Sequence, residues 1–278
     1  SGIRSWAVET SELLYDYREL LTERTLLIAV SQSGRSVELV RLLEELSGRV
    51  PVIGVTNSAD SDLARASDFV LPIYAGSETS VSTKTYTCSI AALALLTAAL
   101  TGQSVEGTAG ALHRGADYIA AMLPAWEERM ANAAAAIGSP SFLIFLGRGE
   151  ARASALAGAL IVKETAKLPT EGMVSGQFRH GPVEVLAPGV VVVLFAGAGI
   201  AREHHRRLAA DLSEKGTPVL WLGAPAETGI AVPIEPPSVD LAPLIEIVPV
   251  QLLAIELATR RGLKPGEFHH TQKITTVE

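Results

Sequence analysis

The fold is decided by one stretch, Thr25-Leu26-Leu27-Ile28-Ala29-Val30-Ser31-Gln32-Ser33-Gly34-Arg35-Ser36. Residues 25–30 form an apolar run without polar alternation, which is typical of a parallel strand covered on both faces. A polar turn with a glycine follows, and after Ser36 the leucines recur at helical spacing until Gly48. Strand, turn and helix in this order predict a right-handed βαβ unit in a parallel, doubly wound sheet.

The same order of elements recurs along the chain. Residues 50–55 predict the next strand, and residues 57–66 predict a short polar helix. Later segments predict strands at 142–146, 190–195 and 219–222, a turn at 147–150, and helices at 151–167 and 201–215. The predicted fold class is therefore α/β, with two doubly wound, flavodoxin-like parallel-sheet domains that carry helices on both faces.

The domain division follows from a region without strand signals. Residues 105–138 predict a helical connection, so we place the first domain at 1–117, the second at 118–265 and a C-terminal tail at 266–278. Little sequence precedes the first clear strand, which favours a first domain truncated at its N-terminus.

Composition and charge exclude several classes of protein. The formal net charge is −7 and no Lys/Arg run exceeds a pair, so we expect no nucleic-acid partner. The most apolar helical stretch, residues 90–100, is too short to span a bilayer, and we expect a buried core helix there and no membrane partner. The single cysteine, Cys88, and the lack of a signal peptide predict a cytoplasmic protein.

The turn at residues 31–36 has the chemistry of a phosphate site. It lies between a predicted strand and a helix N-terminus, where backbone N–H groups and the positive end of the helix dipole converge. Its serine hydroxyls add rotatable donors, and Gly34 permits close approach of a ligand. The alternative is that Ser36 is only a helix N-cap and the other serines only satisfy a turn. The spacing alone does not separate the two interpretations.

Two further segments leave similar alternatives open. The polar cluster at 77–85 precedes a predicted helix, and its hydroxyls either line a sugar site or cap that helix. His180 is able to exchange a proton near neutral pH, or it is a turn or core residue before Gly181 and Pro182.

Glu164 lies on the same predicted helix face as Leu156 and Leu160. Desolvation on an apolar face raises the pKa of a carboxylate towards the range useful for moving a proton on and off carbon. The alternative is a buried salt bridge with Lys163 or Lys167.

These segments together resemble the SIS (sugar isomerase) domain family. The chain is similar to the double-SIS isomerase part of glucosamine-6-phosphate synthase and to stand-alone phosphosugar isomerases and deaminases. The resemblance rests on the turn at 31–36, on 56–68, on Ala75-Gly76-Ser77-Glu78 with Thr83-Lys84-Thr85, on 159–164 with 176–182, and on the tail 271–278. It departs at Ile161, where the synthase has a lysine.

The resemblance implies roles for individual residues. It implies a sugar-phosphate site made by Ser31, Gln32, Ser33, Ser36, Val81 and Ser82. It implies that Glu164 moves a proton between C1 and C2, that His180 helps to open the sugar ring, and that Lys273 forms a Schiff base or assists ring opening. It also implies a homodimer in which His180 reaches the site of the neighbouring subunit.

No cofactor and no metal site are expected. The pairs His204-His205 and His269-His270 have no carboxylates at ligand spacing, so we expect them on the solvated surface.

The expected function is a phosphosugar isomerase or amino-sugar-phosphate deaminase that acts on a hexose 6-phosphate through an enediol or enolamine. No segment resembles the glutaminase half of the synthase. Two alternatives remain open: a non-catalytic phosphosugar-binding regulatory module, and the isomerase part of a glutamine-fructose-6-phosphate aminotransferase.

Overall fold

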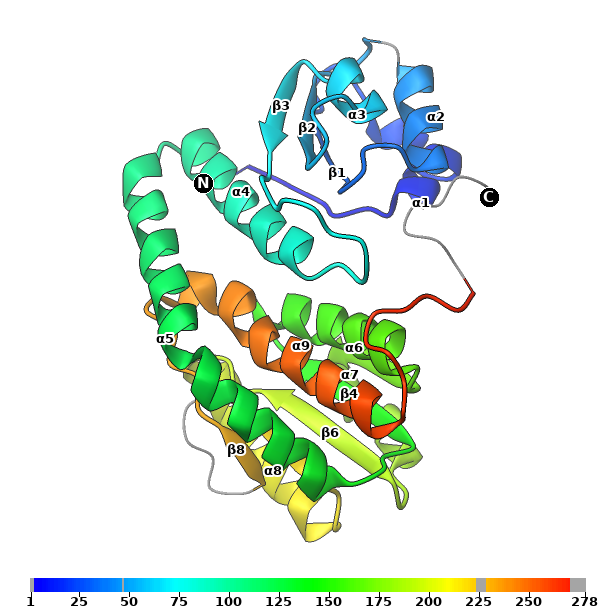
Figure 1. The fold of residues 1–278 in the computed structure, drawn as a ribbon. Coiled ribbons are helices and arrows are strands. Elements are labelled where there is room, and N and C mark those ends of the chain that lie inside the picture. Colours follow the sequence, from blue (N-terminus) through cyan, green and yellow to red (C-terminus); the bar gives the residue numbers. More distant parts are fainter. Residues whose placement is uncertain (1–2, 47, 224–228, 271–278) are drawn as a thin grey trace. The chain divides into compact units, whose positions relative to one another are not determined.

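The computed structural model describes residues 3–46, 48–223 and 229–270 (Figure 1). The chain forms two compact units, Ser1–Thr108 and Ala109–Glu267. The described residues 268–270 are grouped with the first unit.

The first unit holds a parallel sheet with the strand order β1-β2-β3. Its elements in chain order are α1 (Thr10–Tyr15), the 3-10 helix η1 (Arg18–Leu20), β1 (Leu27–Val30), α2 (Val37–Leu46), β2 (Val52–Thr56), α3 (Asp62–Ala66), β3 (Phe69–Pro72) and α4 (Lys84–Thr101). The strand, turn and helix predicted around residues 31–36 are confirmed.

Helix α2 covers one face of this sheet because its leucines form one apolar stripe. Leu39 and Leu43 are buried in a cluster with Ala29 of β1. On the other face of β1, Ile28 is 37% and Val30 is 49% exposed. The expectation that both faces of this strand are covered is therefore wrong within the described structure, where β1 is an edge strand.

Helix α4 also differs from its prediction. Only Thr85, Ala92 and Ala98 of α4 are buried, so the expected buried core helix at 90–100 is wrong. The apolar residues of α4 lie all around the helix, and only one side packs on the sheet, where Ala92 joins the cluster around Ile53 and Val55 of β2. The next helix, α5 (Val105–Ile137), confirms the predicted helical connection and crosses the division between the units.

The second unit holds a parallel sheet with the strand order β5-β4-β6-β7-β8. Its elements after α5 are β4 (Phe142–Gly147), α6 (Ala151–Ala166), β5 (Thr170–Val174), α7 (Ser175–Phe178), the 3-10 helix η2 (Pro182–Val185), β6 (Val190–Phe195), α8 (Gly199–Glu214), β7 (Val219–Leu222), β8 (Ile230–Val232), the 3-10 helix η3 (Val239–Leu241) and α9 (Ala242–Arg260). All the predicted elements of this half are present, whereas β5 and β8 were not predicted.

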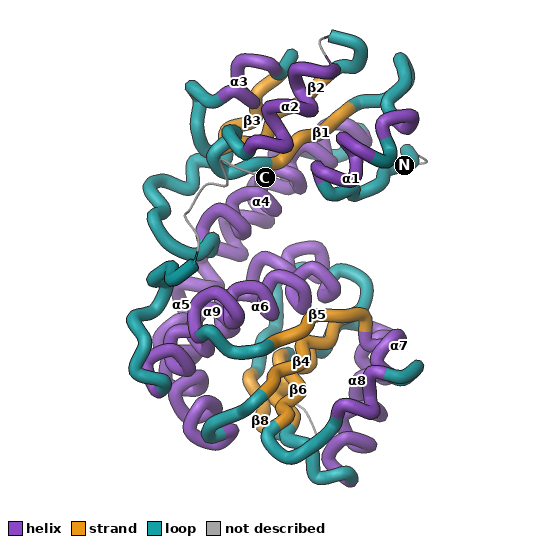
Figure 2. Tube along the Cα trace, turned by 90° about the vertical axis from the view of Figure 1, so that its right-hand side faces the viewer, coloured by secondary structure: helices purple, strands orange, loops and turns teal. Residues whose placement is uncertain are grey.

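Helices lie on both faces of the sheet of the second unit (Figure 2), and the core forms between them and the sheet. On one face Val192 and Leu194 pack with Leu208 and Leu212 of α8. On the other face α6 and α9 pack together, and Gly158 of α6 lies so close that an added Cβ would contact Phe145 and Val250 at 3.2 Å. The prediction of helices on both faces of a parallel sheet is confirmed for this unit.

Two helices, α4 and α9, reach the length and mean hydropathy of a segment that crosses a membrane. In α9, 67% of that segment is buried inside the structure. Helix α9 is thus a mostly buried helix of the second unit.

Candidate functional site

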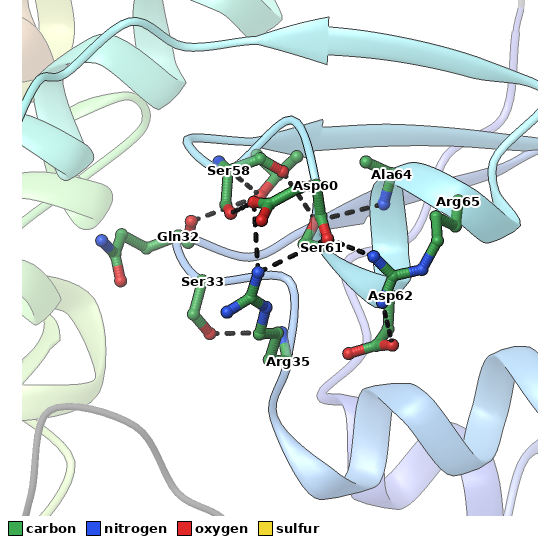
Figure 3. Close-up of polar contacts among 10 residues, drawn as sticks. Gln32, Ser33, Arg35, Ser58, Asp60, Ser61, Asp62, Ala64 and Arg65 are labelled. Atoms are coloured by element: carbon green, nitrogen blue, oxygen red, sulfur yellow. Dashed lines mark hydrogen bonds and ion pairs between the residues drawn. The ribbon is translucent and has the colours of Figure 1, made fainter.

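The turn at residues 31–36 lies at the carboxyl end of β1 and leads into α2. Its backbone is tied to the end of β2, because Ser31 N donates to Val55 O at 3.0 Å and Asn57 N donates to Gln32 O at 3.1 Å. Figure 3 shows the Gln32 side chain directed away from the other labelled side chains. The backbone of the turn is therefore held from the sheet, while this side chain stays available to a ligand.

The turn offers unused hydrogen-bond donors. In the part of the chain that the structure describes, the backbone N–H groups of Gln32 and Ser33 have no acceptor. The hydroxyl oxygens of Ser31 and Ser33 accept from Gly34 N at 3.1 Å and Arg35 N at 3.2 Å. Each hydroxyl still has its hydrogen to donate, which suits an acceptor-rich group such as a phosphate.

Ser36 occupies the N-cap position of α2, since its carbonyl accepts from Val40 N at 3.0 Å. Neither its hydroxyl nor its N–H has a hydrogen-bond partner among the described residues. The side chain therefore does not cap the helix, and these donors lie at the positive end of the α2 dipole. An anion is the ligand that such an arrangement favours.

Gly34 and Arg35 shape the turn without supplying its donors. Gly34 has φ +61°, and a Cβ at this position would clash with the Oγ of buried Ser61. The Arg35 guanidinium is directed towards Asp60 and pairs with its carboxylate at 3.1 Å (Figure 3). The hydroxyl of Ser58 and the charge of Arg35 hold the pKa of Asp60 below its usual value. The charge of Arg35 is thus balanced by Asp60, so the free donors of the turn are neutral groups.

Asn57 connects this turn to the segment after β3. Its Nδ2 donates to Gly76 O at 2.8 Å, and its Oδ1 accepts from Ala75 N at 2.9 Å. Its backbone N–H donates to Gln32 O after β1. Asn57, which follows β2, therefore connects the segments at the carboxyl ends of all three strands. Asn57 is a residue of this edge that was not predicted, although its position directly after a buried strand is the signal that identifies it.

The cluster at 77–85 leads into α4, which begins at Lys84, and a carboxylate caps the helix. Glu78 accepts from the backbone N of Thr83 at 3.0 Å and of Thr85 at 3.2 Å, and from the Thr85 hydroxyl at 2.6 Å. The predicted cap by hydroxyls is therefore replaced by a cap from Glu78. Val81 is buried and Ser82 is half-buried in the intervening bend, and their binding role stays a prediction.

Glu164 lies half-buried on α6. The predicted apolar, desolvated stripe beside it is wrong in the described structure, because Leu156 is 46% and Leu160 is 52% exposed. The buried face of α6 is instead the one that carries Val162, which is fully buried. The Lys167 ammonium donates to the backbone carbonyl oxygens of Glu164 and Glu267.

His180 is exposed and follows α7, where its N–H donates to Gln177 O at 2.9 Å. It lines an open pocket of about 420 Å³ together with Glu171, Met173, Gln177 and Pro182. Glu164 is not among the lining residues, so the structure does not bring these two predicted catalytic groups into this pocket. The third, Lys273, lies outside the described residues.

The histidine pair on α8 was predicted to be solvated, and this is wrong for one member. His205 is only 1% exposed, because it shares a helix face with Leu208 and Leu212, whereas its neighbour His204 is exposed. Within the described ranges no group of three His, Cys, Asp or Glu side chains is placed to hold a metal ion.

The comparisons with known proteins agree on one family. The SIS domain model matches residues 2–99 and 139–261. Glutamine–fructose-6-phosphate aminotransferase [isomerizing] from Pyrococcus horikoshii is 32% identical over 279 residues, which cover 97% of this chain and 46% of that protein. The chain thus spans about half the length of the curated relatives that it matches.

Two solved structures share the fold at 21% identity. The C-terminal domain of glucosamine-fructose-6-phosphate aminotransferase from Francisella tularensis has a TM-score of 0.80, with 93% of this chain and 81% of that chain covered. Glucosamine-6-phosphate deaminase from Thermotoga maritima has a TM-score of 0.77, with 96% and 80% covered. With two parallel α/β units and family matches in both halves, this chain belongs to the SIS domain family as a double-SIS protein.

Proposed function

We propose that this chain is a phosphosugar isomerase or amino-sugar-phosphate deaminase, and that it holds a hexose 6-phosphate by its phosphoryl group at the turn 31–36. One observation carries the proposal: Gln32, Ser33 and Ser36 present unpaired N–H donors at the start of α2, among the described residues. Membership of the SIS family and the similarity to isomerizing aminotransferases support a sugar phosphate as the ligand.

The proposed chemistry is proton transfer between adjacent carbons. The Glu164 carboxylate takes the proton from the carbon beside the carbonyl, and the electron pair of that C–H bond forms the C=C bond of the enediol as the carbonyl oxygen takes up a proton. Glu164 then returns its proton to the neighbouring carbon while the hydroxyl on the first carbon loses its proton and becomes the new carbonyl, which exchanges aldose and ketose. For an amino sugar the intermediate is an enolamine, and water hydrolyses the resulting imine to release ammonia. We assign ring opening to His180 and stabilisation of the carbonyl, as a Schiff base or during ring opening, to Lys273.

We further propose that the active species is a homodimer in which His180 acts in the site of the partner subunit. The exposure of His180, and of Leu156 and Leu160 beside Glu164, is compatible with a partner that covers them. Sedimentation of the purified chain tests this part independently of activity.

A second candidate is the isomerase part of a glutamine–fructose-6-phosphate aminotransferase. It is favoured by the alignment of 97% of this chain with 46% of the Pyrococcus horikoshii protein. Both candidates require the same phosphate turn and the same proton transfer.

The decisive experiment compares Glu164→Gln with the unchanged chain in solvent-deuterium exchange at C1 of fructose 6-phosphate and at C2 of glucosamine 6-phosphate. We expect Glu164→Gln to lower exchange by about 10²- to 10⁴-fold while thermal stabilisation by the sugar phosphates persists. The matched control is Glu256→Gln, a half-buried carboxylate that pairs with Arg260 on α9. Exchange that is undiminished in Glu164→Gln overturns the mechanism, and binding without exchange in the unchanged chain indicates a regulatory module instead.

A further inference from the structure

The second unit contains a pocket that the proposed function does not use. It measures about 450 Å³ and lies between α7 and α8, two helices that are adjacent in Figure 2. We call it the arginine pocket, defined by Arg148, Ser175, Arg179, His204, His205 and Arg207.

The floor of the arginine pocket is a buried polar pair. Ser175 is 4% and His205 is 1% exposed, and Ser175 Oγ lies 2.6 Å from His205 Nε2. His205 Nδ1 lies 3.1 Å from Ala196 O, and because a carbonyl only accepts, Nδ1 carries the hydrogen. Nε2 of the neutral ring then accepts from the Ser175 hydroxyl. Burial lowers the pKa of His205, which agrees with a neutral ring.

The rim of the arginine pocket is cationic. Arg148 crosses Gly176 so closely that a Cβ there would lie 2.9 Å from its Nη2. Among the described residues, no carboxylate forms an ion pair with Arg148. Arg179 pairs with Asp211 at 2.8 Å, and Asp211 is the only carboxylate among the lining residues. Arg207 pairs with Glu203 at 3.0 Å, so Arg148 is the one lining arginine that has no carboxylate partner among the described residues.

The position of the arginine pocket is that of a ligand site in a doubly wound sheet. Arg148 follows β4, Ser175 follows β5, and Ala196 follows β6, so the three groups lie at the carboxyl ends of adjacent strands. The chain leaves β4 for β5 on one side and reaches β6 on the other, and ligands bind outside the strand ends at such a switch point. A cationic rim above a buried polar floor suits a hydrated anion better than an apolar ligand.

We propose that the arginine pocket is a second anion site, which binds a phosphate group as a free phosphate or as a phosphorylated sugar. Arg148 is its main ligand, because its guanidinium has no carboxylate partner in the described part of the chain and can bind two phosphate oxygens. The site belongs to the second unit and uses none of the residues of the turn 31–36, so it stands independently of the proposed function.

The test is calorimetric titration of the full chain with inorganic phosphate, fructose 6-phosphate and unphosphorylated fructose. We expect two phosphate-dependent sites per chain. Arg148→Ala should weaken one of them about tenfold or more, while the joint change Ser33→Ala and Ser36→Ala should weaken the other. The matched control is Arg152→Ala, an exposed arginine one turn further along that does not line the pocket.

A second variant tests the same site in case Arg148→Ala does not fold. His204→Glu places a negative charge at an exposed position on the rim and should weaken the same site, with an unchanged circular dichroism spectrum. A single site that responds to Arg148→Ala and not to the serine changes supports the arginine pocket and overturns the phosphate turn. A single site that responds only to the serine changes, or no binding at all, overturns the arginine pocket. The ligand is identified at the site that responds to Arg148→Ala. Tighter binding of fructose 6-phosphate than of inorganic phosphate at that site identifies a sugar ester, and equal binding identifies free phosphate.

Discussion

Gly34 and Ser61 pack so closely that a methyl group on the glycine would overlap the buried serine hydroxyl. Gly34 also has φ +61°, so an alanine there meets both a backbone and a packing penalty. We expect Gly34→Ala to lower the free energy of unfolding by about 1 kcal/mol for the backbone and by about 1–3 kcal/mol more for the overlap. Urea unfolding measures the sum.

Gly102→Ala is the matched control for this change. Gly102 has φ +70°, but nothing lies within 4 Å of an added Cβ. The free energy of unfolding of the control should therefore fall only by the contribution of the backbone conformation. Equal losses in the two variants would show that the contact between Gly34 and Ser61 does not constrain the turn.

Substitutions of Ser36 and Ser61 should affect different properties, ligand binding and stability respectively. The Ser36 hydroxyl has no partner among the described residues, so Ser36→Ala should leave the unliganded melting temperature nearly unchanged. It should weaken sugar-phosphate binding about tenfold, as measured by thermal shift against ligand concentration. Unchanged affinity would remove Ser36 from the phosphate site.

Ser61→Ala should show the opposite pattern. The Ser61 hydroxyl donates to Ser58 O at 2.8 Å and accepts from Ala64 N at 3.2 Å as the N-cap of α3. Its loss should cost about 1–2 kcal/mol of unfolding free energy. The ligand-induced shift, taken relative to the lower starting temperature, should persist.

Glu78 gives a third prediction because its carboxylate caps α4 through Thr83 and Thr85. Glu78→Gln keeps the size of the side chain but removes the charge, and it should destabilise the first unit by about 1–2 kcal/mol. Glu106→Gln in the first turn of α5 is the control for a general helix-dipole effect. A loss in Glu106→Gln as large as in Glu78→Gln would contradict the specific cap.

The buried strands and their turns were predictable from the sequence, because a parallel strand covered by helices is an unbroken apolar run. Val190–Phe195 of β6 shows this, since all six residues are buried. Strand β5 escaped prediction because Thr170–Val174 contains polar residues and a glycine. Gly172 is needed there because a Cβ would overlap the α6 backbone at Ala155 and Leu156. β8 spans only Ile230–Val232 at the sheet edge, which is too short for a periodic signal.

The candidate site was predictable where local chemistry decides it and unpredictable where packing decides it. The donors around Ser33 follow from a strand-to-helix turn, which is a local property. The burial of His205 depends on which helix face meets the sheet, and its spacing from Leu208 and Leu212 was the available signal. The exposure of Leu156 and Leu160 shows that an apolar pair on a helix does not by itself identify the buried face.

The carboxylate of Glu246 on α9 gives a pH prediction. Glu246 is 4% exposed, and Ser154 Oγ donates to it at 3.4 Å. Burial raises its pKa from 4.5 to about 7. The folded state then holds a proton that the unfolded state has released, so stability falls as the pH rises from about 4.5 to about 7 and is constant above that. The size of this fall is about 3 kcal/mol, at 1.36 kcal/mol per pKa unit.

Glu246→Gln isolates this contribution from the rest of the titration. Glutamine has the same shape as protonated glutamate and does not ionise. The stability of the variant should therefore not show this decrease with rising pH, and the variant should be more stable than the unchanged chain at pH 8. His205 acts in the opposite direction, because its lowered pKa makes the fold lose stability as the pH falls below 6.5. The difference between the two unfolding curves removes that contribution, since His205 is present in both proteins. Glu256→Gln, at a half-buried position of α9 that pairs with Arg260, should show no such difference. A difference for Glu246→Gln that does not change with pH would mean that burial does not raise the pKa of Glu246.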